Sequence, residues 1–170
     1  MNFWALVIML LAVAMALGPL LMLQPSRGDR RREQFRQRAT ELGLRVTIEA
    51  APQQATDMEA PGHQPVYRLP VAAGEGSREA WLLLRAAYRH DTHFLGEWRW
   101  HGPGRPSEGE RRCLAQWLPE LPASVSAVGA DRRGWYLFWE EKGEVTDVER
   151  LSRYLHDLRG CSRSPASVRG

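Results

Sequence analysis

The stretch SVSAVGADRRGWYLFWEEKG, residues 124–143, decides the fold class of this chain. Its two halves have the pattern of β-strands joined by a turn around residues 131–134. Alternation in the second strand places three apolar side chains on one face and two on the other: Trp135, Leu137 and Trp139 against Tyr136 and Phe138. Since both faces are apolar, the hairpin must be covered by other elements.

The segment that follows, TDVERLSRYLHDLRG at residues 146–160, predicts a helix that supplies this cover. Thr146 and Glu149 have the spacing of a capping box at its start, and Gly160 is a typical stop. Apolar residues recur at helical spacing between them: Val148, Leu151, Leu155 and Leu158. We therefore expect an amphipathic helix that packs on the hairpin.

Short strands are predicted upstream of the hairpin, at residues 44–50, 65–71, 80–87 and 93–102. The prolines of 65–71 are typical of an edge strand, and 80–87 is apolar enough for a buried one. The 93–102 strand would carry Phe94, Trp98 and Trp100 on one face and His93, Glu97, Arg99 and His101 on the other. Ser107 and Glu110 then form a capping box for a helix that ends at Leu118.

The order of these elements predicts an α+β domain over residues 44–160, with a mainly antiparallel sheet and two packing helices. The chain of 170 residues is long enough for one such domain. We expect the tail, residues 161–170, to be disordered.

Residues 1–24 contain no charged side chain and are predicted to form a transmembrane anchor. The run from Phe3 to Leu23 has 21 residues, which as a helix spans about 31 Å, the thickness of a bilayer's hydrocarbon core. A cleaved secretory signal is the main alternative, because Ala14-Met15-Ala16 has the form of a cleavage site. A buried core helix is a second alternative.

Residues 25–43 are predicted to form a basic juxtamembrane helix. Six arginines follow the span closely and are candidates for contact with anionic lipid headgroups: Arg27, Arg30, Arg31, Arg32, Arg36 and Arg38. Positive charge beside a span favours the cytoplasmic side, so we expect the N-terminus outside and the domain in the cytoplasm. The arginines could instead only set this topology, or bind RNA.

The rest of the chain is nearly neutral. Residues 25–45 contain seven arginines and three acids, a net charge of +4, whereas the whole chain carries +3. The remaining −1 lies in residues 46–170, where a nucleic-acid-binding domain would present a basic face. We therefore expect the partners to be the lipid bilayer and a protein of the inner membrane or cytoplasm, and no nucleic acid.

The two cysteines, Cys113 and Cys161, match neither a disulfide framework nor a metal motif. We expect free thiols, which fits a cytoplasmic domain, although two cysteines can bridge.

No catalytic, cofactor-binding or metal-binding residue is predicted. His90, Asp91, His93, Glu97 and His101 are the best metal candidates. Residues four apart on a strand are about 13 Å apart, however, so only His90 and His93 could share an ion across a turn. There is no nucleophile elbow and no phosphate-binding glycine motif.

Six tryptophans lie outside the apolar run. Their alternation favours core packing. A second interpretation is that Trp100 or Trp139 belongs to a surface for a protein partner, since Trp and Arg are common interface anchors.

Two segments, LQPSRGDRRREQFRQRATELGLRV at 23–46 and GWYLFWEEKGEVTDVERLSRYLHDL at 134–158, carry a resemblance. With the apolar run, they resemble uncharacterised single-pass inner-membrane proteins of gammaproteobacteria. That resemblance implies a bacterial inner-membrane location and no known activity. Around residues 3–47, the exit Gln24-Pro25-Ser26-Arg27 is similar to that of the YajC-type accessory subunit of the preprotein translocase. This similarity implies a short outside N-terminus, a cytoplasmic domain and a role in protein export.

The sequence therefore predicts a membrane-anchored cytoplasmic interaction or scaffold module without catalytic activity. An accessory subunit of protein export and a membrane-tethered hydrolase or metal enzyme are the alternatives.

Overall fold

The computed structural model describes residues 2–22, 26–53, 62–72, 74, 79–86 and 93–163, and within them every side chain except those of 16–22, 27, 93 and 163. The helices in this part of the chain are α1 (Phe3–Met22), α2 (Arg27–Glu41), α3 (Glu108–Trp117), the 3₁₀ helix η1 (Leu118–Glu120) and α4 (Val145–Arg163). The strands are β1 (Arg45–Ala50), β2 (His63–Pro70), β3 (Trp81–Arg85), β4 (His93–Leu95), β5 (Trp98–His101), β6 (Val125–Asp131) and β7 (Gly134–Trp139).

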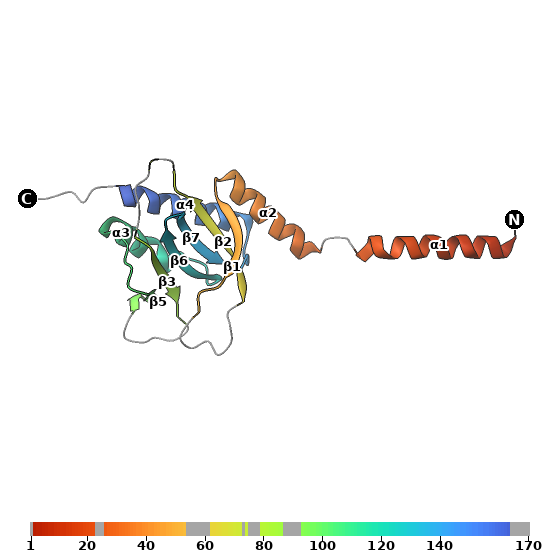
Figure 1. Cartoon of the computed structure of the whole chain (residues 1–170), viewed down its shortest axis with the longest axis horizontal. Coiled ribbons are helices and arrows are strands. Elements are labelled where there is room, and N and C mark those ends of the chain that lie inside the picture. Colours follow the sequence, from red (N-terminus) through yellow and green to blue (C-terminus); the bar gives the residue numbers. More distant parts are fainter. Residues whose placement is uncertain are drawn as a thin grey trace, which may run out of the picture. The chain divides into compact units, whose positions relative to one another are not determined.

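The seven described strands form one antiparallel sheet in the order β1-β2-β7-β6-β3-β5-β4 (Figure 1). Together with the helices, this sheet confirms the predicted α+β class.

The chain divides into two compact units, Met1–Glu33 and Gln34–Gly170. Among the described residues, no helix combines the length and the apolar character that crossing a membrane requires. Side chains of α1 are described from Phe3 to Met15, a portion that is about 20 Å long. The transmembrane span therefore stays a prediction.

The β6–β7 hairpin forms as its sequence predicts. The Asp131 carboxylate accepts a hydrogen bond from the backbone N–H of Arg133 at 2.7 Å, which stabilises the turn. Gly134 follows with φ 139°, and a Cβ at this position would collide with the carbonyl oxygen of Leu69 in β2. Glycine is therefore required where β7 begins.

The main core lies between one face of the sheet and the helices. The alternation predicted for β7 is confirmed, since Trp135, Leu137 and Trp139 are buried in this core. The apolar positions predicted for the last helix are also buried: Val148, Leu151, Leu155 and Leu158. Phe35 and Ala39 of α2 and Leu114 of α3 also belong to this core, so helices from three parts of the chain cover the same face.

The predicted capping box of α3 is present. The Ser107 hydroxyl accepts the N–H of Glu110 at 3.3 Å, and the Glu110 carboxylate accepts the N–H of Ser107 at 2.9 Å. The second Glu110 oxygen accepts the indole N–H of Trp135 at 2.8 Å. Glu110 thus both caps α3 and joins it to β7.

Both ends of α4 differ from the prediction. The backbone N–H of Glu144 donates to the Asp147 carboxylate at 2.8 Å, so α4 begins at Val145 and Thr146 lies inside it. The helix also continues through Gly160 to Arg163, and Cys161 on this extra turn is bonded to Cys113 of α3. At the start of α4, the Glu144–Asp147 hydrogen bond outweighs the predicted capping box at Thr146. At its end, the disulfide outweighs the stop signal of Gly160.

Two strand predictions are wrong. The segment around 65–71 forms β2, which lies between β1 and β7, so β1 is the edge strand instead. Residues 93–102 form the short strands β4 and β5 rather than one strand, because the chain turns at Gly96 with φ 57°. A glycine inside a strand pattern is a known signal for such a break.

Candidate interaction surface

Two of the six candidate lipid-facing arginines are used inside the domain. Arg36 donates two hydrogen bonds to the Glu141 carboxylate, at 2.9 and 3.1 Å. Arg38 donates to Glu149 of α4 at 2.6 and 3.0 Å and to Glu41 at 2.9 Å. Docking of α2 on the domain brings both arginines against acidic side chains, and their own side chains remain 39% and 38% exposed, so their contact with lipid stays a prediction.

The other four arginines belong to the first part of α2. Arg30, Arg31 and Arg32 are exposed, and Arg32 lies 3.7 Å from Asp29. The side chain of Arg27 lies outside the described residues. Contact of these four with lipid headgroups stays a prediction.

The two candidate partner-surface tryptophans lie in the core region. Trp139 is 0% exposed and packs against Phe35 and Tyr67, with ring centroids 5.2 and 5.3 Å away. The favoured interpretation, core packing, is confirmed for Trp139, and the second interpretation, a partner surface, is wrong there because β7 lies inside the sheet under α2. Trp100 is half-buried, with Phe94 4.7 Å from its ring.

The candidate metal ligands are only partly visible. His90, Asp91 and the side chain of His93 lie outside the described residues. Elsewhere in the described part of the chain, no three His, Cys, Asp or Glu side chains come together as a metal site would require.

The prediction of free thiols is wrong in this structure. Cys113 of α3 and Cys161 of α4 form a disulfide, with Cα atoms 6.6 Å apart. The signal was weak because the two cysteines are 48 residues apart in sequence and meet only when α3 packs on α4.

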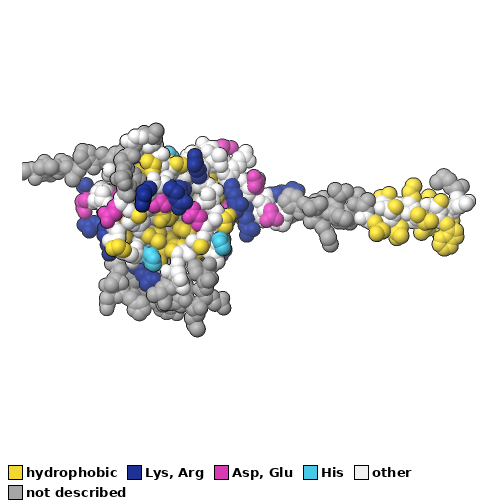
Figure 2. Space-filling view, viewed as in Figure 1, with side chains coloured by type: hydrophobic (Ala, Val, Ile, Leu, Met, Phe, Trp, Pro, Cys, Tyr) yellow, Lys and Arg dark blue, Asp and Glu magenta, His cyan; other side chains and the backbone are white. Residues whose placement is uncertain are grey.

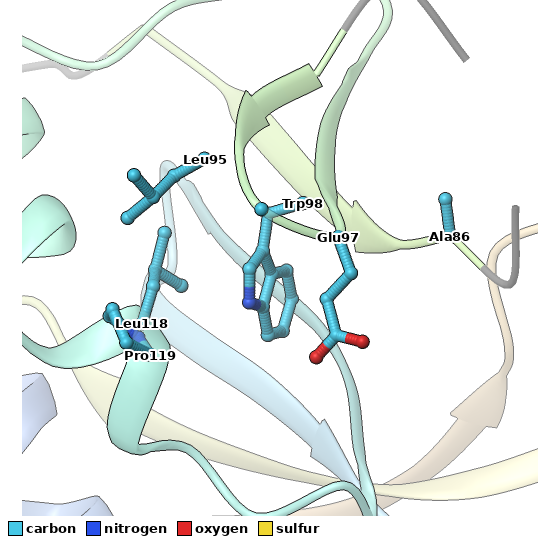
Figure 3. Close-up of a pocket in the computed structure, with 7 residues that line it drawn as sticks. Ala86, Leu95, Glu97, Trp98, Leu118 and Pro119 are labelled. Carbon is cyan, nitrogen blue, oxygen red and sulfur yellow. The ribbon is translucent and has the colours of Figure 1, made fainter. Parts of the chain in front are cut away.

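A pocket of about 370 Å³ lies between the β4–β5 turn and η1, and its lining combines apolar and acidic groups (Figure 3). In Figure 3 the side chains of Leu95, Leu118 and Pro119 lie on one side of the Trp98 ring, and that of Glu97 lies on the other. Ala86 and Gly96 complete the described lining. The sequence analysis missed this pocket, because it predicted a single strand over residues 93–102 and the pocket depends on the turn at Gly96.

Arg85 holds two residues that line this pocket, Trp98 and Glu97, in place. Its guanidinium lies 4.7 Å from the centre of the Trp98 ring, a cation–π distance. The same group donates to the carbonyl oxygens of Pro122 and Leu121, at 2.6 and 3.1 Å, and lies 2.9 Å from Glu97. Burial lowers the pKa of Arg85, and the nearby Glu97 carboxylate opposes that shift.

The Glu97 side chain remains 55% exposed despite this ion pair. Its carboxylate can therefore accept hydrogen bonds from a group outside the domain. An apolar wall beside an acidic rim suits a long basic side chain, whose aliphatic stem contacts the wall while its charged end meets the carboxylate.

The other face of the sheet combines apolar and charged side chains (Figure 2). Arg68 is only 6% exposed there. It donates to Asp131 at 2.9 Å and lies over the Tyr136 ring at 4.4 Å. Burial, then the Asp131 carboxylate, raises the pKa of Tyr136. The buried cation is thus balanced within the sheet, as burial of a charge requires.

No protein-family model, curated protein or solved structure matches this chain.

Proposed function

We propose that this protein is a single-pass membrane protein of the bacterial inner membrane whose α+β domain is an interaction or scaffold module for another protein. The observation that supports this most is the division of the chain. An uncharged apolar helix belongs to one unit, and a compact sheet with its own core forms the other. An anchor and a separate folded domain are the parts that such a module needs.

α1 is proposed as the anchor. Its 20 residues are FWALVIMLLAVAMALGPLLM, and none of them is charged. A helix of this length is about 30 Å long, which matches the hydrocarbon core of a bilayer. The apolar side chains described on α1 are exposed, including Phe3, Trp4 and Ile8, and a bilayer would bury them.

The arginines after α1 support a cytoplasmic domain, because clustered positive charge next to a span is retained on that side. The Cys113–Cys161 disulfide favours the opposite side, since such bonds persist in oxidising compartments. In the cytoplasm the two sulfurs would be reduced and would remain neighbours.

Membrane fractionation tests the anchor. The full chain should stay with the membrane after an alkaline carbonate wash and leave it only in detergent, whereas a chain lacking residues 1–24 should not pellet with membranes. Release of the full chain by carbonate would contradict the anchor. A fluorescent protein fused after Gly170 should fluoresce if the domain is cytoplasmic, and a dark fusion that is exported intact would reverse the topology.

The pocket beside Glu97 is proposed as the contact point for a basic side chain of the partner. A photo-crosslinking residue placed at Pro119, on the pocket rim, should capture one defined protein in intact cells. The same residue at Gln116, an exposed position on α3, is the matched control. The capture should weaken when Glu97 is changed to Arg. An identical pattern from both positions, or no effect of the Glu97 change, would exclude the pocket as the contact.

A further inference from the structure

The edge strand β1 lacks several of the features that usually prevent an edge from pairing. It has six residues, RVTIEA, in unbroken register with β2, and it contains no proline, lysine or bulge. Ile48 on this strand is 52% exposed, the largest exposure of a big apolar side chain described outside α1. Strand edges of this kind are templates for another strand.

The opposite edge of the sheet differs. There, β4 has only three residues, and its register with β5 is irregular. Short and irregular edge strands resist pairing. The contrast indicates that β1, and not β4, is suited to a partner strand.

In an antiparallel ladder, alternate residues of β1 bond to β2, and the alternation shows which backbone groups of β1 are free to bond to another strand. The N–H of Ala51 donates to the Gly62 carbonyl at 2.9 Å, so these two residues are a hydrogen-bonded pair in the β1–β2 ladder. Because such pairs alternate in an antiparallel ladder, Thr47 and Glu49 also bond to β2. The N–H and C=O groups of Val46 and Ile48 consequently point away from β2.

This alternation limits how a second β1 could pair with the first in antiparallel orientation. When Thr47 lies opposite the second copy's Thr47, Val46 lies opposite Ile48, and the outward backbone groups of both residues can bond. The same alignment places Arg45 opposite Glu49 twice, once on each side of the centre. A shift by two residues in either direction loses the pairing of Arg45 with Glu49.

We infer that the domain self-associates through β1, in antiparallel register with Thr47 opposite Thr47. The sheet then continues from one copy into the next. Arg45 forms an ion pair with Glu49 of the second copy, and Ile48 is covered by Val46 of that copy. The charge pattern selects a second copy over an unrelated strand, because one six-residue segment supplies both members of each ion pair.

Arg45 is suited to this role. It is exposed, and the described residues include no ion-pair partner for it within the chain. Glu49 is 29% exposed and lies 3.6 Å from Arg68 and 3.5 Å from Arg133, which hold it at the surface. The inference does not depend on the membrane anchor, although two chains in one membrane would meet more often than two chains in solution.

Cysteine cross-linking of the full chain in native membranes tests the register. Directly opposed residues of a non-hydrogen-bonded pair have Cα atoms about 4.5 Å apart, within reach of a disulfide. Thr47→Cys should therefore form a dimer on a non-reducing gel after mild oxidation. Ile48→Cys should not, because residue 48 of one copy is two positions out of line with residue 48 of the other. The unaltered chain, with its internal disulfide, is the background control.

A charge reversal tests the ion pairs. Arg45→Glu in the Thr47→Cys chain places two acids opposite each other at both ends of the register, and we expect about a tenfold loss of cross-linked dimer. Arg112→Glu on α3 is the matched control and should leave the yield unchanged, because Arg112 is exposed and remote in sequence from β1.

Three outcomes would overturn the inference. Cross-linking of Ile48→Cys without Thr47→Cys would show pairing in another register. Absence of dimer from both cysteine variants would exclude the β1 interface, provided that circular dichroism shows both chains folded. Equal losses from Arg45→Glu and Arg112→Glu would show that general charge, and not Arg45, controls association.

Discussion

Glu141 is the residue whose role differs most from its appearance in the sequence. In EEKG, residues 140–143, it resembles one more solvated charge in a turn. In the structure its side chain is 1% exposed, and it accepts hydrogen bonds from Arg36 and from the Tyr67 hydroxyl, the latter at 3.0 Å. Its φ of 56° is unusual for a non-glycine residue. These contacts compensate for a strained backbone and fasten α2 to the sheet.

Removing Arg36 alone should therefore lower the free energy of unfolding more than removing the charges of both Arg36 and Glu141. Arg36→Met leaves the buried Glu141 carboxylate without its main cation, and the free energy of unfolding should fall by about 3 kcal/mol. The double variant Arg36→Met/Glu141→Gln should recover part of that loss, because no buried charge remains. Urea unfolding of the three chains measures the difference, and a double variant less stable than the single one would contradict this account.

Tyr67 should make the domain sensitive to alkali. Burial, followed by the Glu141 charge and the hydrogen bond to it, raises the pKa of Tyr67 above the ordinary value of 10.0. Below pH 10 the tyrosine is protonated in both the folded and unfolded chains. As the pH rises further, only the unfolded chain loses the proton, so stability falls.

The Tyr67→Phe variant should lose about 2 kcal/mol of unfolding free energy at neutral pH, because its hydrogen bond to the buried Glu141 carboxylate is missing. Between pH 10 and pH 11, the free energy of unfolding of this variant should fall by less than that of the native chain. Some alkaline loss will remain, because burial also raises the pKa of Tyr136 and Tyr154. Urea titrations at several pH values give both quantities, and parallel curves for the two chains would rule out Tyr67 as the source.

At the scale of elements, α2 illustrates how tertiary contacts reassign residues. Its sequence, RGDRRREQFRQRATE, predicts a basic helix at a membrane surface. In the structure Phe35 and Ala39 are buried in the core, and Arg36 and Arg38 pair with acids of the domain. The basic character belongs to the first part of α2, while its last two turns are part of the fold.

The α3–α4 pair gives a prediction for the disulfide. Closing a loop of 48 residues reduces the entropy of the unfolded chain and should stabilise the domain by about 4 kcal/mol. Adding a reductant should therefore lower the urea midpoint of the native chain, and it should have no effect on a Cys113→Ser/Cys161→Ser variant. Two titratable thiols in the untreated native chain would show that the bond does not form.

At the scale of the whole molecule, the two units predict independent stability. The core residues of the sheet domain lie between Phe35 and Leu158, and α1 contributes none of those described. Deleting residues 1–24 should change the free energy of unfolding of the domain by less than about 0.5 kcal/mol, the range typical of changes away from a core. The measurement compares both chains in the same detergent, and a large loss would show that α1 packs on the domain.

The sequence by itself determined the α+β class, the β6–β7 hairpin, the faces of β7 and the α3 cap. These features depend on neighbours in the chain: alternation, turn chemistry and capping act within a few residues. The apolar run and the arginines after it are also features of the sequence, and the membrane location predicted from them stays a prediction that fractionation can test.

Only the tertiary structure decided the position of β2 inside the sheet, the burial of Glu141, the disulfide and the Glu97 pocket. Each of these joins residues that are distant in sequence, such as Arg36 with Glu141 or Cys113 with Cys161. A local pattern shows which face of a strand is apolar, but it does not show which strand or helix will lie beside it. The edge that the described residues leave open, β1, is therefore also a property of the assembled sheet.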